Sequence, residues 1–135
     1  MIVADASLIT CFAVQSEWSQ LADGVCEADA TWAAPLLWRS EVRDVLVKYM
    51  QVAGMTLDAA LLAMHSADEI INGREYAVDT GKVLELATAS GCTARECEYV
   101  ALALDLDVPL VTMEKQVLRA FPKVAVAVDR FAKAK

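Results

Sequence analysis

Along the whole chain, short and mostly apolar runs alternate with longer segments in which apolar residues recur every three or four positions. Runs of four or five such residues have the length of short strands, and the wider spacing is typical of helices with one buried face. The predicted strands are residues 1–4, 31–34, 75–78, 109–112 and 124–128. The predicted helices are residues 17–26, 36–52, 56–71, 80–90, 93–104 and 114–120. This alternation predicts an α/β fold, in which a mainly parallel central sheet of four to five short strands is flanked by helices.

Residues that favour helix starts support these boundaries. Ser16 can act as the N-cap of the helix at 17–26, and the apolar residues before it form the lead into that helix. Asp79 or Thr80 can cap the helix that ends at Ser90. The helix that Thr93 opens is apolar nearly all round, which indicates a central and buried position.

The length and composition of the chain indicate one folded domain, residues 1–135. A chain of 135 residues has the ordinary size of a domain, and a hydrophobic share of 57% is enough for a full core. Charged residues interrupt every apolar stretch well before the ~18 residues that a membrane-spanning helix needs. Met1 leads directly into a strand without the pattern of a secretory signal. We therefore expect a cytoplasmic protein that does not associate with a membrane.

The cysteine, histidine and charge content argues against several other kinds of site. The four cysteines form no C-x-x-C pair and His65 is the single histidine, so a structural zinc site and a Ser-His-Asp arrangement are not expected. In a reducing compartment the cysteines act as small apolar residues. The net charge of −7 argues against a broad basic surface for nucleic acid. It suits a small substrate or a basic protein partner, and a divalent metal would offset part of it locally.

Four acidic residues, far apart in the sequence, stand out by their positions. Asp5 follows the first predicted strand and Glu114 follows the fourth. Glu96 lies in the first turn of a helix, and Glu41 interrupts the apolar stripe of another. Sites in parallel α/β sheets form at the carboxyl ends of the strands, so these acids can converge on one pocket. Clustered carboxylates need a cation and raise the pKa of at least one of their number, which predicts a metal-dependent enzyme that acts on phosphate esters.

Glu41 is the strongest single indication of a functional site. Trp38, one turn before it, and Val45, one turn after it, share its face of the helix. A carboxylate on such an apolar face is costly unless it is paired or binds a metal. Arg39 and Arg43 are close in sequence but point to other faces of the helix.

Each of the other three acids also has a purely structural interpretation. Asp5 can cap the turn through Ser7, and aspartate after a strand often does so. Residues 93–96 fit the capping box S/T-x-x-E, in which Thr93 and Glu96 exchange hydrogen bonds with each other's backbone. Glu114 can interact with the dipole of the helix that it opens. Taken alone, Glu96 and Glu114 fit these structural roles better than a ligand role.

Together, four segments resemble the PIN domain, and most closely the VapC-type toxins of bacterial toxin–antitoxin pairs. Residues 2–7 (Ile-Val-Ala-Asp-Ala-Ser) are similar to the first strand of the family with its D-x-S/T motif. Residues 35–42 are similar to the segment that carries its helical Glu, and residues 96–103 to its third acidic segment. Residues 108–115 are similar to its T-x-D motif. The resemblance covers nearly the whole chain, with the segments in the family's order and spacing.

This resemblance implies a metal-dependent endoribonuclease, the toxin of a type II toxin–antitoxin pair. The residues that it implies as catalytic and as ligands of Mg²⁺ or Mn²⁺ are Asp5, Glu41, Glu96 and Glu114. The metal would activate a water molecule for in-line attack on a phosphodiester. The hydroxyls of Ser7 and Thr112 would orient ligands or waters. The implied partners are an RNA substrate, a cognate antitoxin protein and a second copy of the chain in a homodimer.

Three residues depart from the family pattern. The family usually has Asp where this chain has Glu96 and Glu114, and commonly an aromatic residue where it has Arg95. Each Glu keeps the charge but adds a methylene, and Mg²⁺ demands near-ideal octahedral geometry. Arg95 adds a cation that can pair with a ligand and displace the metal. A catalytically impaired PIN-like scaffold or protein-binding module is therefore the alternative, and a phosphatase or DNA nuclease with the same metal site is a third interpretation.

Overall fold

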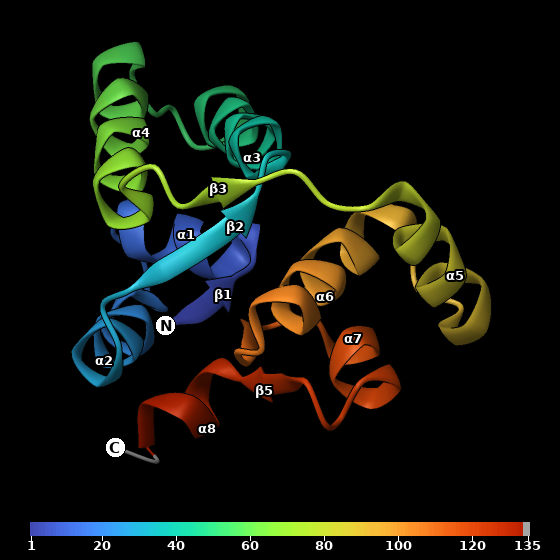
Figure 1. Ribbon diagram of the computed structural model, residues 1–135. Helices are drawn as coiled ribbons and strands as arrows, with labels where there is room; N and C mark the ends of the chain where they lie inside the picture. The colour runs from blue at the N-terminus through green and yellow to red at the C-terminus, as the bar shows by residue number, and fades with distance from the viewer. Residues whose placement is uncertain (134–135) are drawn as a thin grey trace.

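The computed structural model describes residues 1–133, in which short strands form one parallel sheet between layers of helices (Figure 1). The strands are β1 (Ile2–Ala4), β2 (Trp32–Pro35), β3 (Glu75–Tyr76), β4 (Leu110–Thr112) and β5 (Ala125–Ala127). The helices are α1 (Ala6–Ala13), α2 (Ser19–Ala28), α3 (Trp38–Val52), α4 (Leu57–Ile71), α5 (Thr80–Ser90), α6 (Ala94–Leu106), α7 (Lys115–Ala120) and α8 (Val128–Lys133). All four strand pairs of the five-stranded sheet are parallel, in the order β3-β2-β1-β4-β5. The predicted α/β fold with a parallel sheet is confirmed.

The sheet separates two hydrophobic clusters, and successive residues of one strand serve different clusters. Ile2 and Ala4 of β1 pack in the cluster that α1, α2, α3, α4 and α8 share, whereas Val3 packs in the cluster of α5, α6 and α7. All three side chains are fully buried. Successive side chains of a strand point to opposite faces of the sheet, so a three-residue strand flanked by two helical layers is apolar throughout.

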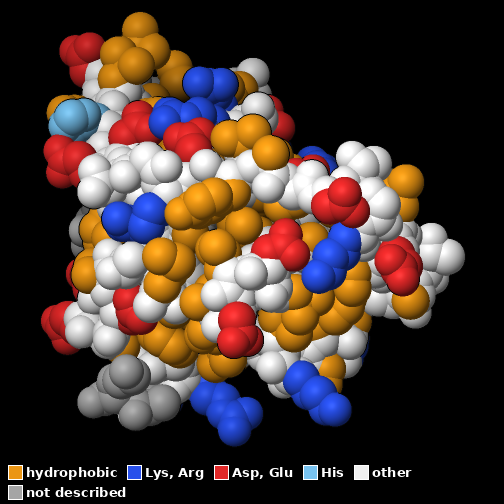
Figure 2. All heavy atoms as spheres, in the orientation of Figure 1, with side chains coloured by type: hydrophobic (Ala, Val, Ile, Leu, Met, Phe, Trp, Pro, Cys, Tyr) orange, Lys and Arg blue, Asp and Glu red, His pale blue; other side chains and the backbone are white. Residues whose placement is uncertain are grey.

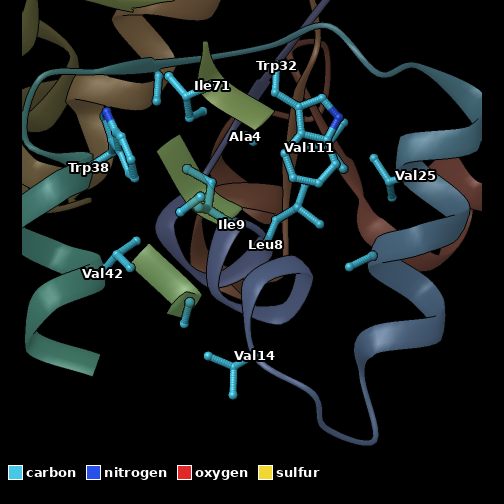
Figure 3. Packing of buried hydrophobic residues seen from close by; sticks show 14 of the residues in the cluster. Ala4, Leu8, Ile9, Val14, Val25, Trp32, Trp38, Val42, Ile71 and Val111 are labelled. Carbon is cyan, nitrogen blue, oxygen red and sulfur yellow. The ribbon is translucent and has the colours of Figure 1, made fainter. Parts of the chain in front are cut away.

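Helix α1 is one of two helices that the sequence pattern does not predict. It begins directly after Asp5, and its residues Leu8 and Ile9 are fully buried. Figure 3 shows these two side chains in the middle of the first cluster, with Trp38 of α3 and Val25 of α2 on either side. Burying each of these two side chains contributes about 1.5–3 kcal/mol.

The other unpredicted helix is α8, which begins where a longer last strand is expected. Both helices are too short for a helical period to stand out from their apolar composition.

The predicted helix caps have mixed outcomes. Asp79, rather than Thr80, caps α5, and its Oδ2 accepts a hydrogen bond of 2.9 Å from the backbone N–H of Lys82. The prediction of Ser16 as an N-cap is wrong, because α2 begins later and its N-cap residue, Trp18, makes no side-chain cap. The Ser16 hydroxyl oxygen instead accepts a hydrogen bond of 3.1 Å from the Trp18 N–H, within the turn that precedes the helix.

The order of the strands creates a switch point beside β1. After β1 the chain adds β2 and β3 on one side, and then crosses over to add β4 and β5 on the other. β1 and β4 are paired in register, with Ala4 opposite Val111, so their carboxyl ends lie side by side. Ligand sites of open α/β sheets form at such a point. Asp5 follows β1 and Thr112 ends β4, so the fold brings these two polar residues to the switch point.

Other features expected from the sequence lie away from this edge. His65 is on the surface of α4 and pairs with Glu69 at 2.7 Å. All four cysteines are free, and Cys92 and Cys97 are buried. None of the helices within residues 1–133 is long and apolar enough to cross a membrane.

Candidate active site

The four acids singled out in the sequence line one cavity of about 250 Å³. They are Asp5, Glu41, Glu96 and Glu114. The polar residues that line the same cavity are Ser7, Thr93, Arg95, Tyr99 and Thr112. Asp5 directly follows β1, Glu41 and Glu96 lie in the first turns of α3 and α6, and Glu114 directly precedes α7. The tertiary fold thus gathers segments that are far apart in the chain.

Asp5 is the most deeply placed of these acids, with an exposed fraction of 6%. Its Oδ1 accepts a hydrogen bond of 2.9 Å from the backbone N–H of Leu8 and thereby caps α1. Its Oδ2 accepts a hydrogen bond from the hydroxyl of Thr112. Asp5 therefore acts as the predicted cap. The same hydrogen bonds hold its carboxylate in a fixed position where it still lines the cavity.

Burial raises the pKa of Asp5 from its usual 3.8 to about 6. The hydrogen bonds from Thr112 and Leu8 lower this pKa, and the negative charge of Glu114 adds a smaller rise. The pKa of one clustered carboxyl group is thus raised, as expected, but not mainly for the expected reason. The main cause of the rise is desolvation, and repulsion between the acids is secondary.

The hydroxyls of Thr112 and Ser7 connect Asp5 to Glu114. The Thr112 hydroxyl, which donates to Asp5, accepts a hydrogen bond of 3.0 Å from the Glu114 backbone N–H. The Ser7 hydroxyl donates a bond of 3.4 Å to Glu114 Oε1. Glu114 occupies the N-cap position of α7 but makes no side-chain cap there, and its exposed carboxylate lies along the cavity. Both hydroxyls therefore contact carboxylates of the cavity, Thr112 that of Asp5 and Ser7 that of Glu114.

Glu41 is held by a residue that the sequence analysis did not identify. Tyr99 of α6 donates a hydrogen bond of 2.6 Å from its hydroxyl to Glu41 Oε1. Tyr99 is 4% exposed, and burial together with this bond raises the pKa of its hydroxyl, which stays a donor. Arg39 does not compete for Glu41, because its guanidinium pairs with Glu75 at 2.8 Å and with Asp68 at 2.7 Å. Nothing in the apolar pattern of α6 separates Tyr99 from its buried neighbours.

Glu96 takes part in the capping box that the sequence predicts. Its Oε1 accepts a hydrogen bond of 2.8 Å from the Thr93 N–H, and its own N–H donates to Thr93 Oγ1 at 3.1 Å. Cys92 and Cys97, on either side of this box, are both buried and occupy the two positions of a hydrophobic staple. Glu96 thus lines the cavity while its carboxylate is engaged at the start of its own helix.

The acids share a cavity without forming a ready-made metal centre. Within residues 1–133, no group of three or more His, Cys, Asp or Glu side chains is arranged so that it could hold a metal ion. Carboxylate and hydroxyl oxygens are nevertheless the donors that Mg²⁺ and Mn²⁺ prefer. Asp5 and Glu114 fit this role best, since they interact electrostatically and Thr112 joins them. The capping box engages Oε1 of Glu96, which holds this carboxylate at the start of its own helix.

Comparison with known proteins supports the fold. No family model and no curated protein matches the chain. Among solved structures, the chain is similar to PAE2754 from Pyrobaculum aerophilum, with a TM-score of 0.73 and 20% sequence identity over 98% of this chain and 94% of that chain. The two proteins therefore share one α/β architecture over nearly their whole lengths.

Proposed function

We propose that this protein is a metal-dependent endoribonuclease and the toxin component of a type II toxin–antitoxin pair. The observation that carries the proposal is the meeting of four acids from distant segments in one cavity at the switch point of the sheet. Desolvation already disfavours the ionised form of Asp5, and a divalent cation would offset that cost. The similarity of the same four segments to PIN-domain motifs supports RNA as the substrate.

In this proposal the acids of the cavity and their hydrogen-bond partners have two roles, to bind the cation and to orient the residues that bind it. A bound Mg²⁺ or Mn²⁺ supplies an activated water and stabilises the charge that develops on the phosphate. Asp5 and Glu114 bind the cation, and Thr112 and Ser7 fix their orientation by hydrogen bonds. Glu41, held by Tyr99, and Glu96 complete the acidic lining and bind the cation directly or through water. Groups that are oriented before the substrate arrives need no rearrangement during the reaction.

A catalytically impaired scaffold or protein-binding module is the second candidate. It is favoured by the capping box, which engages the carboxylate of Glu96. Releasing Glu96 for a metal costs about 1 kcal/mol, the typical worth of a helix cap. Mass action of a divalent ion well above its Kd would offset a cost of this size, so the capping box alone does not outweigh the ribonuclease proposal.

Two surface features support protein partners, the antitoxin and a second copy of the chain. Large apolar side chains are exposed on the hairpin formed by α3 and α4. Figure 2 shows hydrophobic atoms at the top of the view, over α4. The large apolar side chains exposed on the hairpin are those of Val47, Val52, Leu57, Leu61 and Leu62. On the face in Figure 2, the Lys and Arg side chains within residues 1–133 are scattered and form no continuous basic patch. With the net charge of −7, this surface suits a basic protein partner.

A substrate panel tests the proposed activity. Single-stranded RNA, single-stranded DNA and a phosphate monoester would be incubated with the protein, with Mn²⁺ or Mg²⁺ and with a chelator. Wild type and Asp105→Asn, a matched change of an exposed acid, should cleave RNA only with metal, and Asp5→Asn should not cleave it. Full activity of Asp5→Asn, or no RNA cleavage by wild type with either metal, would overturn the proposal. Cleavage of DNA or of the monoester alone would support the third interpretation.

The toxin role needs a separate test in cells. Expression of wild type should arrest growth, whereas Asp5→Asn should not, because it lacks the deepest acid of the cavity. If the proposal holds, a short reading frame next to the gene encodes the antitoxin, and its co-expression should restore growth. If cells that express wild type grow normally although the purified protein cleaves RNA, the proposed ribonuclease activity stands and the toxin role is wrong.

A further inference from the structure

Arg95 is a cation that lines a cavity with four acids. It is the second residue of α6, its side chain is exposed, and it lines the cavity beside Glu41, Glu96 and Glu114. Within residues 1–133 it forms neither an ion pair nor a side-chain hydrogen bond. Glu96 cannot pair with it easily, since successive helix residues point apart and the Glu96 carboxylate is bound to Thr93.

Two other arginines of the chain make several hydrogen bonds that connect separate segments of the fold. Arg39 makes a two-pronged contact with Glu75. Arg74 donates hydrogen bonds of 2.9 Å to the backbone carbonyls of Trp32 and Ile70. Arg95, by contrast, lies in the first turn of a helix, where the positive end of the helix dipole disfavours a cation. Its position is therefore explained better by a ligand than by the stability of α6.

We propose that Arg95 binds a phosphate group of the RNA substrate, next to the phosphodiester that is cleaved. This inference rests on the proposed ribonuclease function and adds a substrate-binding residue to it. A cavity lined by four carboxylates repels a polyanion, and a bound divalent ion offsets only part of that charge. A guanidinium matches two phosphate oxygens with parallel N–H donors, and an exposed, unpaired one at the rim is free to do so. Arg95 thus lowers KM for RNA and takes no part in holding the metal.

The test compares Arg95→Ala and Arg95→Lys with Arg43→Ala, a matched loss of an exposed arginine on α3 outside the cavity. Cleavage of single-stranded RNA would be followed at saturating Mn²⁺ over a series of salt concentrations. Loss of one charge-assisted contact should raise KM about 10- to 100-fold with a much smaller change in kcat. Arg95→Lys should fall between wild type and Arg95→Ala, because it keeps the charge without the paired donors.

Two further readouts separate substrate binding from a structural or metal effect. The slope of log(1/KM) against log salt should become less steep by about 0.7 in Arg95→Ala, the value for one phosphate contact on a single strand. The Mn²⁺-induced rise in Tm should equal that of wild type. An unchanged KM and salt slope in Arg95→Ala, with an active wild type, would overturn the role of Arg95 and leave the ribonuclease standing.

Other outcomes are equally decisive. Tighter Mn²⁺ binding and faster cleavage by Arg95→Ala would mean that Arg95 competes with the metal, which also overturns the inference. No cleavage of RNA by wild type would overturn the proposed function and this inference together. Arg95→Gln, which keeps most of the side-chain length, would replace Arg95→Ala if the shorter side chain lowers Tm in the absence of metal.

Discussion

The Tyr99 hydroxyl donates a hydrogen bond of 2.6 Å to Glu41 Oε1 and so joins helix α6 to helix α3 across the cavity. The two residues are 58 positions apart in the chain. This contact explains how a carboxylate can occupy an otherwise apolar helix face without an arginine partner. It also fixes Glu41 next to the other three acids of the candidate site.

Replacing Tyr99 by Phe should destabilise the protein and disturb the cavity. The ring still fills its buried position, but Glu41 loses its donor, which costs about 1.5–3 kcal/mol for a bond to a charged group. Urea unfolding should show this loss, and Tyr49→Phe, on the same helix as Glu41, is the control. In a double-mutant cycle with Glu41→Ala, which removes the acceptor of this bond, the two effects should not add. Simple additivity would mean that the hydrogen bond contributes nothing.

Asp5→Asn should change how stability depends on pH. The pKa of Asp5 is raised from 3.8 to about 6, so between these values the unfolded chain ionises first and the free energy of unfolding of wild type falls as pH rises. The loss amounts to about 3 kcal/mol above pH 6 and is absent below about pH 4. Without metal, Asp5→Asn should lack this fall.

Chemical unfolding of the two proteins from pH 4 to pH 8, in the presence of a chelator, measures this difference. The exposed acid of Asp105→Asn provides the control, whose profile should follow that of wild type. Parallel profiles for wild type and Asp5→Asn would show that Asp5 titrates as an ordinary carboxyl group.

Millimolar Mn²⁺ should raise the Tm of wild type and leave that of Asp5→Asn nearly unchanged. A ligand that binds only the native state stabilises it by mass action, by about 2.7 kcal/mol at one hundred times its Kd. Differential scanning fluorimetry with and without metal provides the measurement, and Ca²⁺ and Mg²⁺ extend it. If Mn²⁺ stabilises neither protein, the scaffold becomes the better proposal.

Glu96 can be tested with two substitutions that separate its cap from its charge. Glu96→Gln can still accept the hydrogen bond from Thr93 and should be about as stable as wild type, whereas Glu96→Ala should lose about 1 kcal/mol. If Glu96 leaves the cap to bind the metal, both variants should bind Mn²⁺ about tenfold more weakly or worse. Wild-type Mn²⁺ affinity in Glu96→Gln would remove Glu96 from the metal site and leave it as a cap.

Local features of the fold could be read from the sequence because the residues that decide them are close together in it. The capping box joins Thr93 to Glu96, and the cap of α5 joins Asp79 to Lys82, each across three positions. The alternation of strands and helices also follows from local spacing. Helix α1 was missed because its eight residues are apolar or small on most sides.

The α/β class, most helix boundaries and the acids of the candidate site could all be predicted from sequence patterns. The groups that hold two of these acids depend on long-range packing: Thr112 for Asp5 and Tyr99 for Glu41. The same packing leaves Arg95 unpaired at the cavity within the described residues, and it buries Asp5 enough to raise its pKa. The physical reason is that burial and long-range hydrogen bonds depend on which elements pack together, whereas caps and periodicity depend on neighbours within one or two turns.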